Sequence, residues 1–230
     1  MSLTEFGETV AQYDPYMVDL GTWWLIHAVA MTSQINASLS WFFLPQRERR
    51  IDRSVLIKTL QDDLLQYGTK PTLKIVQREV AAIMHTYAVP IPRPQSDPED
   101  NISSPFSRLA LWQYLRNTDH FERSTPTPVP PEALGIILSA LSQDCSCHHV
   151  ERKTHQEINL KNHILLRACT FLGQSFQALL TLATTGENIL GKEILTTQTT
   201  TNERFIFFQS MPAADWARTF YNRFTLRNIA

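Results

Sequence analysis

The sequence predicts a mainly α-helical protein with a small β-hairpin near its carboxyl end, built as a helical bundle that contains helix–turn–helix and winged-helix-like modules. Three observations lead to this prediction. Apolar residues recur every three or four positions across 52–87, which is the period of one helix face. β-Branched and aromatic residues fill 193–198 and 204–209 on either side of a polar tract, as in a hairpin. Apolar residues make up 43% of the 230 positions and charged residues 19%, a balance typical of a folded globular chain.

The first predicted elements are rich in aromatic residues. A helix is expected from about Thr22 to Met31, with Asp19 or Thr22 itself as its N-cap. The apolar stretch 39–44 follows and ends at a proline. Because large aromatic side chains lie on both elements, we expect them to form one compact hydrophobic cluster.

Two amphipathic helices joined by a tight turn are predicted next. The first begins after Asp52 and runs to about Tyr67, where Gly68 fits the stop position. The second begins after Pro71 and runs to about Tyr87. The apolar residues expected to face the core are Leu56, Leu60, Leu64 and Tyr67 in the first helix, and Leu73, Val76, Val80, Ile83 and Tyr87 in the second.

Proline-rich connectors separate this pair from the second half of the chain. Four prolines lie within 89–98, where they block both the helix and the sheet ladder. A short helix is expected at 106–115, and a second connector, 126–131, ends in a proline suited to open a helix over 132–141. The predicted domains are a helix–turn–helix module at 1–90, a connector at 91–131 and a helical module at 132–230.

The last predicted module changes character along its length. Residues 142–157 are expected to form a polar loop, and 164–182 a buried helix interrupted near Gly173. The hairpin within 193–209 follows, and a last helix is expected over 212–220. A helical pair followed by a hairpin is the general plan of a winged-helix module.

Charge is unevenly distributed, although the net charge is only −1. Residues 1–46 hold four acidic residues and no lysine or arginine, whereas 47–78 hold eight basic residues against four acidic ones. The basic segment is therefore where DNA would bind, with cations on phosphates and an amide on a base edge. The residues expected to contact DNA are Arg49, Arg50, Lys70, Lys74, Gln77 and Arg78. The alternative is an ordinary solvated helix face.

Other features of the sequence bound the function classes. Neither G-x-G-x-x-G nor G-x-x-x-x-G-K-[ST] occurs, so no nucleotide-binding loop and no cofactor is expected. Three cysteines make no disulfide framework and fit a reducing cytoplasm. We find no secretory signal, and no apolar run in the sequence reaches the length of a membrane span.

A cysteine–histidine cluster invites a metal interpretation. It comprises Cys145, Cys147, His148 and His149, with His155 nearby. Zinc needs four ligands at spacings that let the chain wrap around the ion, and C-x-C-H-H is too compressed to supply all four. A polar surface loop is the favoured interpretation, and no metal is expected.

The chain is not expected to be an enzyme. Asp14 and Asp19 could form an acid–base pair, but capping and turn formation account for both carboxylates. His27 lies on an apolar helix and is expected to be a buried histidine with a backbone or carboxylate partner. Cys169 is expected to be buried and unreactive. A site that joins Asp14, Asp19 and His27 is the least favoured alternative.

The opening of the chain carries Leu3-Thr4, Gly7, Asp14-Pro15-Tyr16, Asp19 and the helix Thr22–His27 in this order. This pattern resembles a bacterial family catalogued as domain of unknown function 4007. Fainter similarities follow in the same order at Trp41-Phe42-Phe43, Leu73–Val80, Thr86-Tyr87 and Ser104-Pro105-Phe106. Family members usually carry a further helical module before this segment, so the chain is expected to be a shortened form.

The resemblance implies a helical, winged-helix-containing protein. Such proteins are often encoded beside sulfur-transfer enzymes, including those of DNA phosphorothioation and related phage-defence loci. Our leading expectation is a cytoplasmic, non-catalytic accessory or DNA-binding protein of a bacterial DNA-modification or anti-phage system. The alternative is a protein–protein interaction or assembly subunit without direct DNA contact, which would dock through its aromatic first region.

Overall fold

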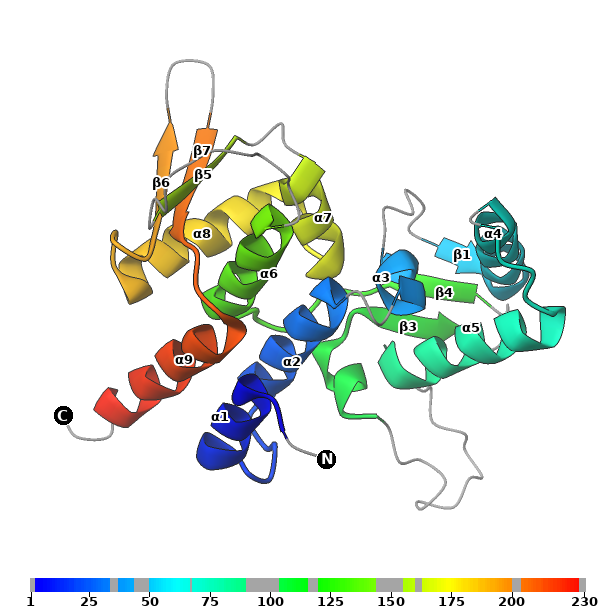
Figure 1. Cartoon of the computed structure of the whole chain (residues 1–230), viewed down its shortest axis with the longest axis horizontal. Helices are drawn as coiled ribbons and strands as arrows, with labels where there is room; N and C mark the ends of the chain where they lie inside the picture. Colours follow the sequence, from blue (N-terminus) through cyan, green and yellow to red (C-terminus); the bar gives the residue numbers. More distant parts are fainter. Residues whose placement is uncertain are drawn as a thin grey trace. The chain divides into compact units, whose positions relative to one another are not determined.

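The computed structural model describes residues 3–33, 37–43, 50–66, 68–89, 104–115, 120–143, 155–159, 163–199 and 204–227. Within these ranges the chain forms nine α-helices, one 3₁₀ helix and seven β-strands (Figure 1). They belong to two compact units. Unit 1 comprises Met1–Pro45 and Pro128–Ala230, and unit 2 comprises Gln46–Thr127. No helix within the described ranges is long and apolar enough to cross a membrane.

Unit 1 combines seven helices with a three-stranded sheet among its described residues. Its helices are α1 (Glu5–Tyr13), α2 (Leu20–Thr32), α3 (Ala37–Phe43), α6 (Pro131–Gln143), α7 (His163–Phe171), α8 (Phe176–Leu190) and α9 (Ala213–Arg227). Its strands are β5 (His155–Asn159), β6 (Leu195–Thr199) and β7 (Arg204–Gln209). The mainly helical class predicted from the sequence is therefore confirmed.

Helix α6 is the centre of unit 1. Residues 131–139 are all buried, and α6 packs against α2, α7, α8 and α9 (Figure 1). Pro131 opens the helix as expected. At Gly135 the helix approaches α9 so closely that a Cβ would overlap the indole of Trp216, whose Nε1 donates to Ser139 Oγ at 3.0 Å. Neighbouring elements thus cover α6 on all sides over 131–139.

The expected aromatic cluster between α2 and α3 is present. Trp24, Phe42 and Phe43 are all buried, and the imidazole of His27 meets the rings of Trp24 and Phe43 edge-on at 5.6 and 5.3 Å. Phe42 and Phe43 pack edge-on at 5.5 Å. Asp19 is the N-cap of α2, since its carboxylate accepts a hydrogen bond from Gly21 N at 2.7 Å.

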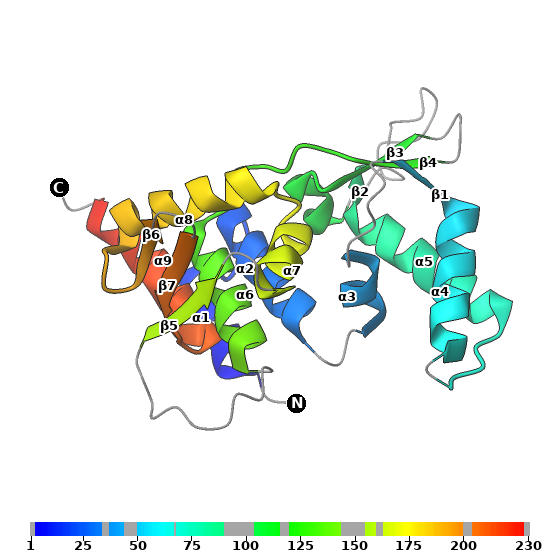
Figure 2. The same cartoon turned by 90° about the horizontal axis from the view of Figure 1, so that it is seen from above.

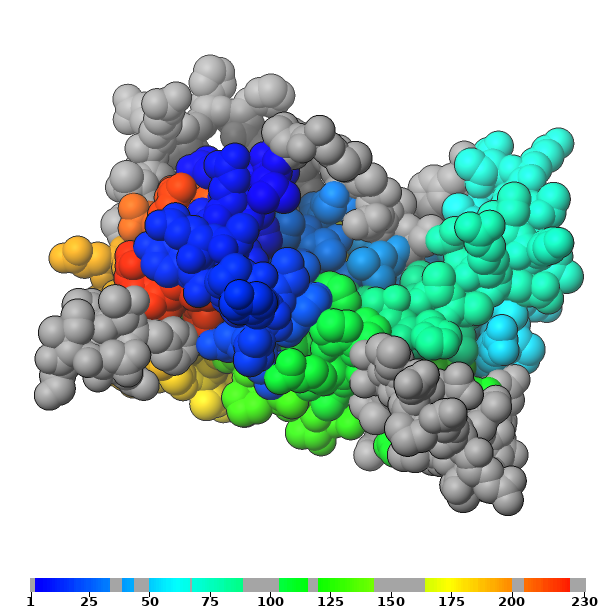
Figure 3. All heavy atoms as spheres, turned by 90° about the horizontal axis from the view of Figure 1, so that it is seen from below, coloured from blue at the N-terminus to red at the C-terminus, as the bar shows by residue number. Residues whose placement is uncertain are grey.

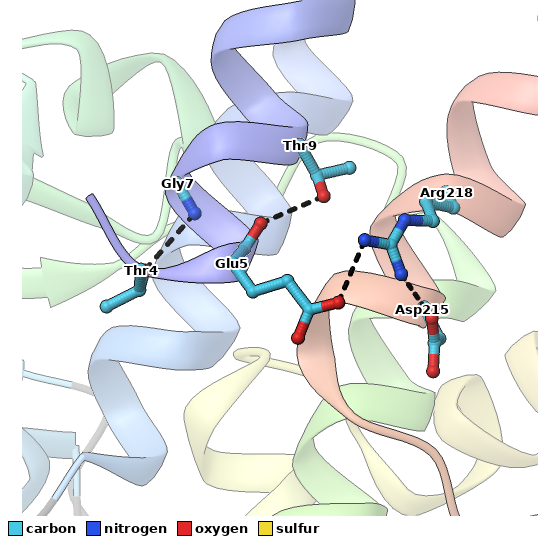
Figure 4. Close-up of polar contacts among 6 residues, drawn as sticks. All are labelled: Thr4, Glu5, Gly7, Thr9, Asp215 and Arg218. Atoms are coloured by element: carbon cyan, nitrogen blue, oxygen red, sulfur yellow. Dashed lines mark hydrogen bonds and ion pairs between the residues drawn. The ribbon is translucent and has the colours of Figure 1, made fainter. Parts of the chain in front are cut away.

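Helix α1, which the sequence did not predict, is held against α9. Thr4 is its N-cap and accepts a hydrogen bond from Gly7 N at 3.2 Å (Figure 4). Arg218 of α9 donates to Glu5 at 2.9 Å and to Asp215 at 2.6 Å (Figure 4). These contacts join the two ends of the described chain.

The sheet of unit 1 is antiparallel, with strand order β5–β7–β6. The hairpin expected within 193–209 is confirmed as the antiparallel pair β6–β7. Helix α8 packs against β6 (Figure 2). The loop expected at 142–157 is wrong at both ends, because α6 continues to Gln143 and β5 pairs with β7 from His155 onward; residues 144–154 lie outside the described ranges. The interruption expected near Gly173 is confirmed: its φ of +62° ends α7, and α8 begins three residues later.

Unit 2 joins two helices to a four-stranded sheet. Its elements are β1 (Arg50–Asp52), α4 (Arg53–Gln66), α5 (Leu73–Tyr87), β2 (Ala88–Val89), the 3₁₀ helix η3 (Pro105–Leu109), β3 (Trp112–Leu115) and β4 (His120–Arg123). The sheet order is β1–β4–β3–β2, with β2 parallel to β3 and the other pairs antiparallel.

The helix expected at 106–115 is present only as the short 3₁₀ helix η3 and is wrong beyond Leu109. Ala110 has a left-handed φ of +55°, which stops η3 after Leu109. Residues 112–115 then pair with β4, where Tyr114 stacks on Phe121 at 4.7 Å between ring centroids. Cross-strand aromatic pairing of this kind stabilises a strand against the alternative of a short isolated helix.

Candidate functional site

The first candidate surface lies on helix α5 of unit 2. We call Lys70, Lys74, Gln77 and Arg78 the basic face. Thr72 is the N-cap of α5, and its hydroxyl accepts a hydrogen bond from Ile75 N at 3.4 Å. The turn before it depends on Gly68, whose φ of +79° is left-handed and whose Cα has no neighbour in the way of a side chain.

The buried stripe of α5 turns the basic face outward. Val76, Val80, Ile83 and Tyr87 are buried, as expected, against α4 and η3. All four residues of the basic face are exposed. The expectation that Leu73 also faces the core is wrong, because this residue is 50% exposed. It lies in the first turn of α5, where the next buried residue along the stripe is Val76.

The charges of the basic face are not neutralised by ion pairs within the described residues. No acidic side chain lies within salt-bridge distance of Lys70, Lys74 or Arg78 in the described part of the chain. Arg50 differs, since its Nη2 lies 3.7 Å from Glu122 Oε2 across the β1–β4 pair. Arg49 lies outside the described ranges. Of the six residues expected to contact DNA, four therefore share one exposed helix end, while Arg50 belongs to the sheet.

Unit 2 as a whole is only slightly basic. It holds twelve lysine and arginine residues against ten aspartate and glutamate residues, so its formal net charge is +2. Any attraction for a polyanion must therefore come from the local arrangement on α5 and not from the field of the whole unit.

The second candidate surface is the motif loop, which we define as Asp14–Asp19. Asp14 Oδ1 accepts from Val18 N at 2.9 Å, and Oδ2 accepts from Asp19 N at 3.1 Å and from Thr22 Oγ1 at 2.7 Å. Partial burial would raise the pKa of Asp14, but these hydrogen bonds to the charged carboxylate outweigh it and lower the pKa. The carboxylate of Asp14 thus holds the motif loop against the start of α2.

The motif loop is fixed in place and yet presents apolar side chains to solvent. Trp23 Nε1 donates to Met17 O at 2.8 Å, and Met17 adopts a left-handed φ of +50°. Tyr16 is 87% exposed and Val18 68%. Figure 3 shows the α1–α2 segment, in dark blue, at the surface beside α9 in red. A non-glycine residue with positive φ costs free energy, and such strain often marks a functional site.

Asp14, Asp19 and His27, the least favoured catalytic alternative, do not form one site. Asp14 and Asp19 serve as caps, and Asp19 and His27 lie about 12 Å apart along α2 at 1.5 Å per residue. His27 is fully buried, and its Nε2 lies 2.7 Å from Phe171 O. Burial lowers the pKa of His27 to about 4, and burial raises the pKa of the Cys169 thiol to about 11. The expectation that His27 and Cys169 are buried is confirmed.

Within the described residues, no group of three or more His, Cys, Asp or Glu side chains could hold a metal ion. The cluster of Cys145, Cys147, His148 and His149 lies outside those ranges. Glu132, at the start of α6, is fully buried and lies 3.4 Å from Arg223 Nη2. Burial raises the pKa of this carboxyl, and the positive charge of Arg223 opposes the effect. The pair lies between α6 and α9, which suits a structural role.

A third surface was missed by the sequence reasoning. A cavity of about 230 Å³, which we call the α8–β6 groove, opens between α8 and the hairpin. Its lining residues are Gln177, Leu180, Thr181, Thr184, Thr197, Gln198, Thr199 and Phe205. Most of them are hydroxyl or amide side chains, and none is charged. The sequence signal was the repetition of Gln and Thr on one side of the segment 177–188, which periodicity of apolar residues does not register.

A family model tests the resemblance that the opening motif of the chain suggested. The model described as "Protein of unknown function (DUF4007)" matches residues 1–185. The chain belongs to the DUF4007 family. The match covers the motif loop, the basic face and all of unit 2, and it ends within α8. The family assignment therefore extends well beyond the motifs that carried the resemblance.

Two solved structures share the fold of this DUF4007 member. One, titled "SspB crystal structure", is 18% identical with a TM-score of 0.71. The other, titled "Magnesium ion-bound SspB crystal structure", is 17% identical with a TM-score of 0.72. Each comparison covers 92% of this chain and 63% of the solved chain, so this chain spans under two thirds of their length. No curated protein matches the chain significantly.

Proposed function

We propose that this chain contacts duplex DNA through the basic face, as a non-catalytic accessory protein of a bacterial DNA-modification or anti-phage system. The observation that carries the DNA contact is the exposure of Lys70, Lys74, Gln77 and Arg78 at one end of α5, without ion pairs in the described part of the chain. The link to a modification or defence system, and with it the cytoplasmic location, rests on the resemblance to the DUF4007 family.

Elementary electrostatics supports this proposal. A lysine or arginine that neutralises a phosphate releases counterions, and this gain is available only where the cation is not already paired. Lys70 lies just before the capped start of α5, where the partial positive charge of the helix also favours an anion. Gln77, between the two cations of α5, offers both a donor and an acceptor to a base edge.

Fluorescence anisotropy with a labelled duplex, measured over a range of salt concentrations, tests the proposal. The variant Lys74→Gln/Arg78→Gln should bind more weakly, and the slope of log K against log salt should shrink by about 0.9 for each phosphate that the variant no longer neutralises. Lys58→Gln is the matched control, because Lys58 is exposed on the side of α4 opposite its buried residues Leu56 and Leu60. Equal binding and equal slopes for all three proteins would refute the role of the basic face.

The non-catalytic part of the proposal has its own test. It is supported by the engagement of Asp14 and Asp19 as caps and by the burial of His27 and Cys169. Because one of the two similar structures is a magnesium-bound protein, the assay contains Mg²⁺. Supercoiled plasmid incubated with the chain should stay supercoiled. Nicked or linear plasmid would contradict the non-catalytic role and leave the DNA contact standing.

A second candidate function is protein assembly through the motif loop. It is favoured by the exposure of Tyr16, Met17 and Val18 on a loop that hydrogen bonds hold in one shape. Pre-organised aromatic and aliphatic side chains are typical anchors of protein interfaces. Sedimentation velocity at rising concentration should then show self-association that Tyr16→Ser/Val18→Ser abolishes. A monomer at all concentrations, with unchanged DNA binding by the variant, would favour the first function.

A further inference from the structure

We propose that the α8–β6 groove reads base edges of duplex DNA and supplies the sequence preference of this chain. This inference rests on the proposed function, in which the basic face supplies attraction to phosphates. It assigns phosphate binding to the basic face and base recognition to the α8–β6 groove. The basic face would bind any sequence, whereas the neutral groove would distinguish one sequence from another.

The order of elements in unit 1 places α8 where a recognition helix would lie. From α6 onward the chain runs helix, strand, helix, helix, strand, strand, with the first strand paired to the last in the order β5–β7–β6. This is the plan of a winged helix, in which α7 and α8 form the helix–turn–helix and β6–β7 the wing. Gly173, with a φ of +62°, lies in the turn between the two helices. In such modules the amino-terminal residues of the second helix contact bases in the major groove.

The groove is held open by fixed contacts between α8 and the hairpin. Glu187 Oε2 accepts hydrogen bonds from Thr197 N at 3.0 Å and from Thr197 Oγ1 at 3.4 Å. Gly186 lies so close to Leu195 that a Cβ would overlap its side chain. The helix and the strand therefore keep one separation, and the groove beside them has a defined width.

The chemistry of the groove selects its occupant. Helix α8 contains no lysine or arginine, so it offers no positive charge to a phosphate. The hydroxyls of Thr181 and Thr184 donate to the carbonyls of Gln177 and Leu180, which leaves their oxygens as acceptors. Acceptors complement the exocyclic amino groups that adenine and cytosine display in the major groove.

Gln177 indicates which base the groove would prefer. It is exposed in the first turn of α8, at the end that would enter the groove of the DNA. A glutamine amide pairs with N6 and N7 of adenine through two hydrogen bonds, whereas a glutamate accepts from N4 of cytosine. The occupant is therefore a duplex segment with adenine at the position that Gln177 contacts.

Selection from a pool of random-sequence duplex DNA, followed by sequencing, tests the inference on the full chain. The wild type should enrich a short consensus that contains adenine. Gln177→Ala should lower the preference at that position about tenfold, and Thr181→Ala should lower it at the position that the Thr181 hydroxyl contacts, with the salt slope unchanged in both. Gln177→Glu should move the preference toward cytosine, which a merely structural role would not do. Thr185→Ala is the matched control, because Thr185 is exposed on α8, makes the same backbone hydrogen bond and does not line the groove.

The outcomes separate this inference from the proposed function. Binding without any enriched sequence, or a consensus unchanged in Gln177→Ala and Gln177→Glu, would overturn the role of the groove and leave the basic face in place. A complete lack of DNA binding would overturn both. Weaker binding with an unchanged consensus in Lys74→Gln/Arg78→Gln would support the division between the two surfaces.

Discussion

At the scale of single residues, His27 shows how a polar side chain can serve the core. Its acceptor is a backbone carbonyl, so Nε2 must carry the proton and the imidazole is the neutral tautomer with hydrogen on Nε2. That carbonyl belongs to Phe171, the last residue of α7, where helix carbonyls have no partner within their own helix. His27 therefore supplies a hydrogen bond to the unpaired carbonyl at the end of α7. A second proton on its ring would place a positive charge inside the aromatic cluster.

The buried state of His27 predicts a loss of stability in mild acid. Its pKa is 6.5 in the unfolded chain and about 4 in the folded one. Between these values the unfolded state binds a proton that the folded state does not, so the free energy of unfolding falls as pH falls. From pH 7 to pH 5 the loss should be about 2 kcal/mol. Urea unfolding at the two pH values measures it.

Comparison with His27→Gln isolates this contribution. Glutamine can still donate to the carbonyl of Phe171 but does not titrate, so all other ionisable groups cancel in the comparison. The variant should lack the loss of about 2 kcal/mol between pH 7 and pH 5. The same pH dependence in both proteins would show that His27 titrates normally.

Residue chemistry also explains which site residues could be found from the sequence. The exposure of Lys74, Gln77 and Arg78 follows from their spacing relative to Val76 and Val80, since local periodicity fixes the side of a helix on which each residue lies. The burial of His27 followed from the apolar character of its helix. The polar side of α8 has a local pattern, but its pairing with β6 in the α8–β6 groove could not be predicted, because no local pattern encodes contacts between a helix and a strand.

At the scale of elements, the longer helices were predictable and the short helix α1 was not. Helices α2, α4, α5 and α6 carry clear apolar stripes or caps, and each lies within a few residues of its expected bounds. Helix α1 has only nine residues, most of them exposed, so its pattern is too short to predict a helix from the sequence. Its stability comes from packing against α9, which is remote in sequence.

The contact between α8 and β6 predicts a large effect for a small substitution. A Cβ at Gly186 would overlap the side chain of Leu195 and would lie 2.9 Å from Pro131 Cβ. The proline ring cannot move aside as the end of a flexible side chain can. Gly186→Ala should therefore destabilise the protein by about 2 kcal/mol in urea unfolding, although alanine is the better helix former.

Gly7→Ala is the matched control for this prediction. Gly7 is also within a helix, but the nearest atom to its added Cβ would be Thr4 Oγ1 at 3.4 Å, an ordinary contact. There the gain in helix propensity should dominate, and the variant should be more stable by up to about 1 kcal/mol. If both variants were equally stable, the close approach of α8 to β6 would not constrain the fold.

At the scale of the whole molecule, unit 1 is formed by both ends of the chain. Helix α2 packs against α6, and α1 packs against α9, so residues before 45 complete a core built mostly from residues after 128. The ion pair of Glu5 with Arg218 spans nearly the full described length. Periodicity is local and cannot reveal such pairings. Unit 2 is continuous in sequence, and its helix–turn–helix was accordingly the part most readily predicted.

The two separate cores predict that the units lose structure separately. Leu60 is buried in unit 2 and Leu179 in unit 1, with exposed fractions of 1% and 0%. Replacing either leucine with alanine should cost about 3 kcal/mol of the stability of its own unit, because a cavity remains where the side chain was. Amide hydrogen exchange reports each unit separately. Leu60→Ala should speed exchange in α4 and α5 while α6 keeps its protection, and Leu179→Ala should do the reverse. Faster exchange throughout the chain in both variants would mean that the cores unfold as one.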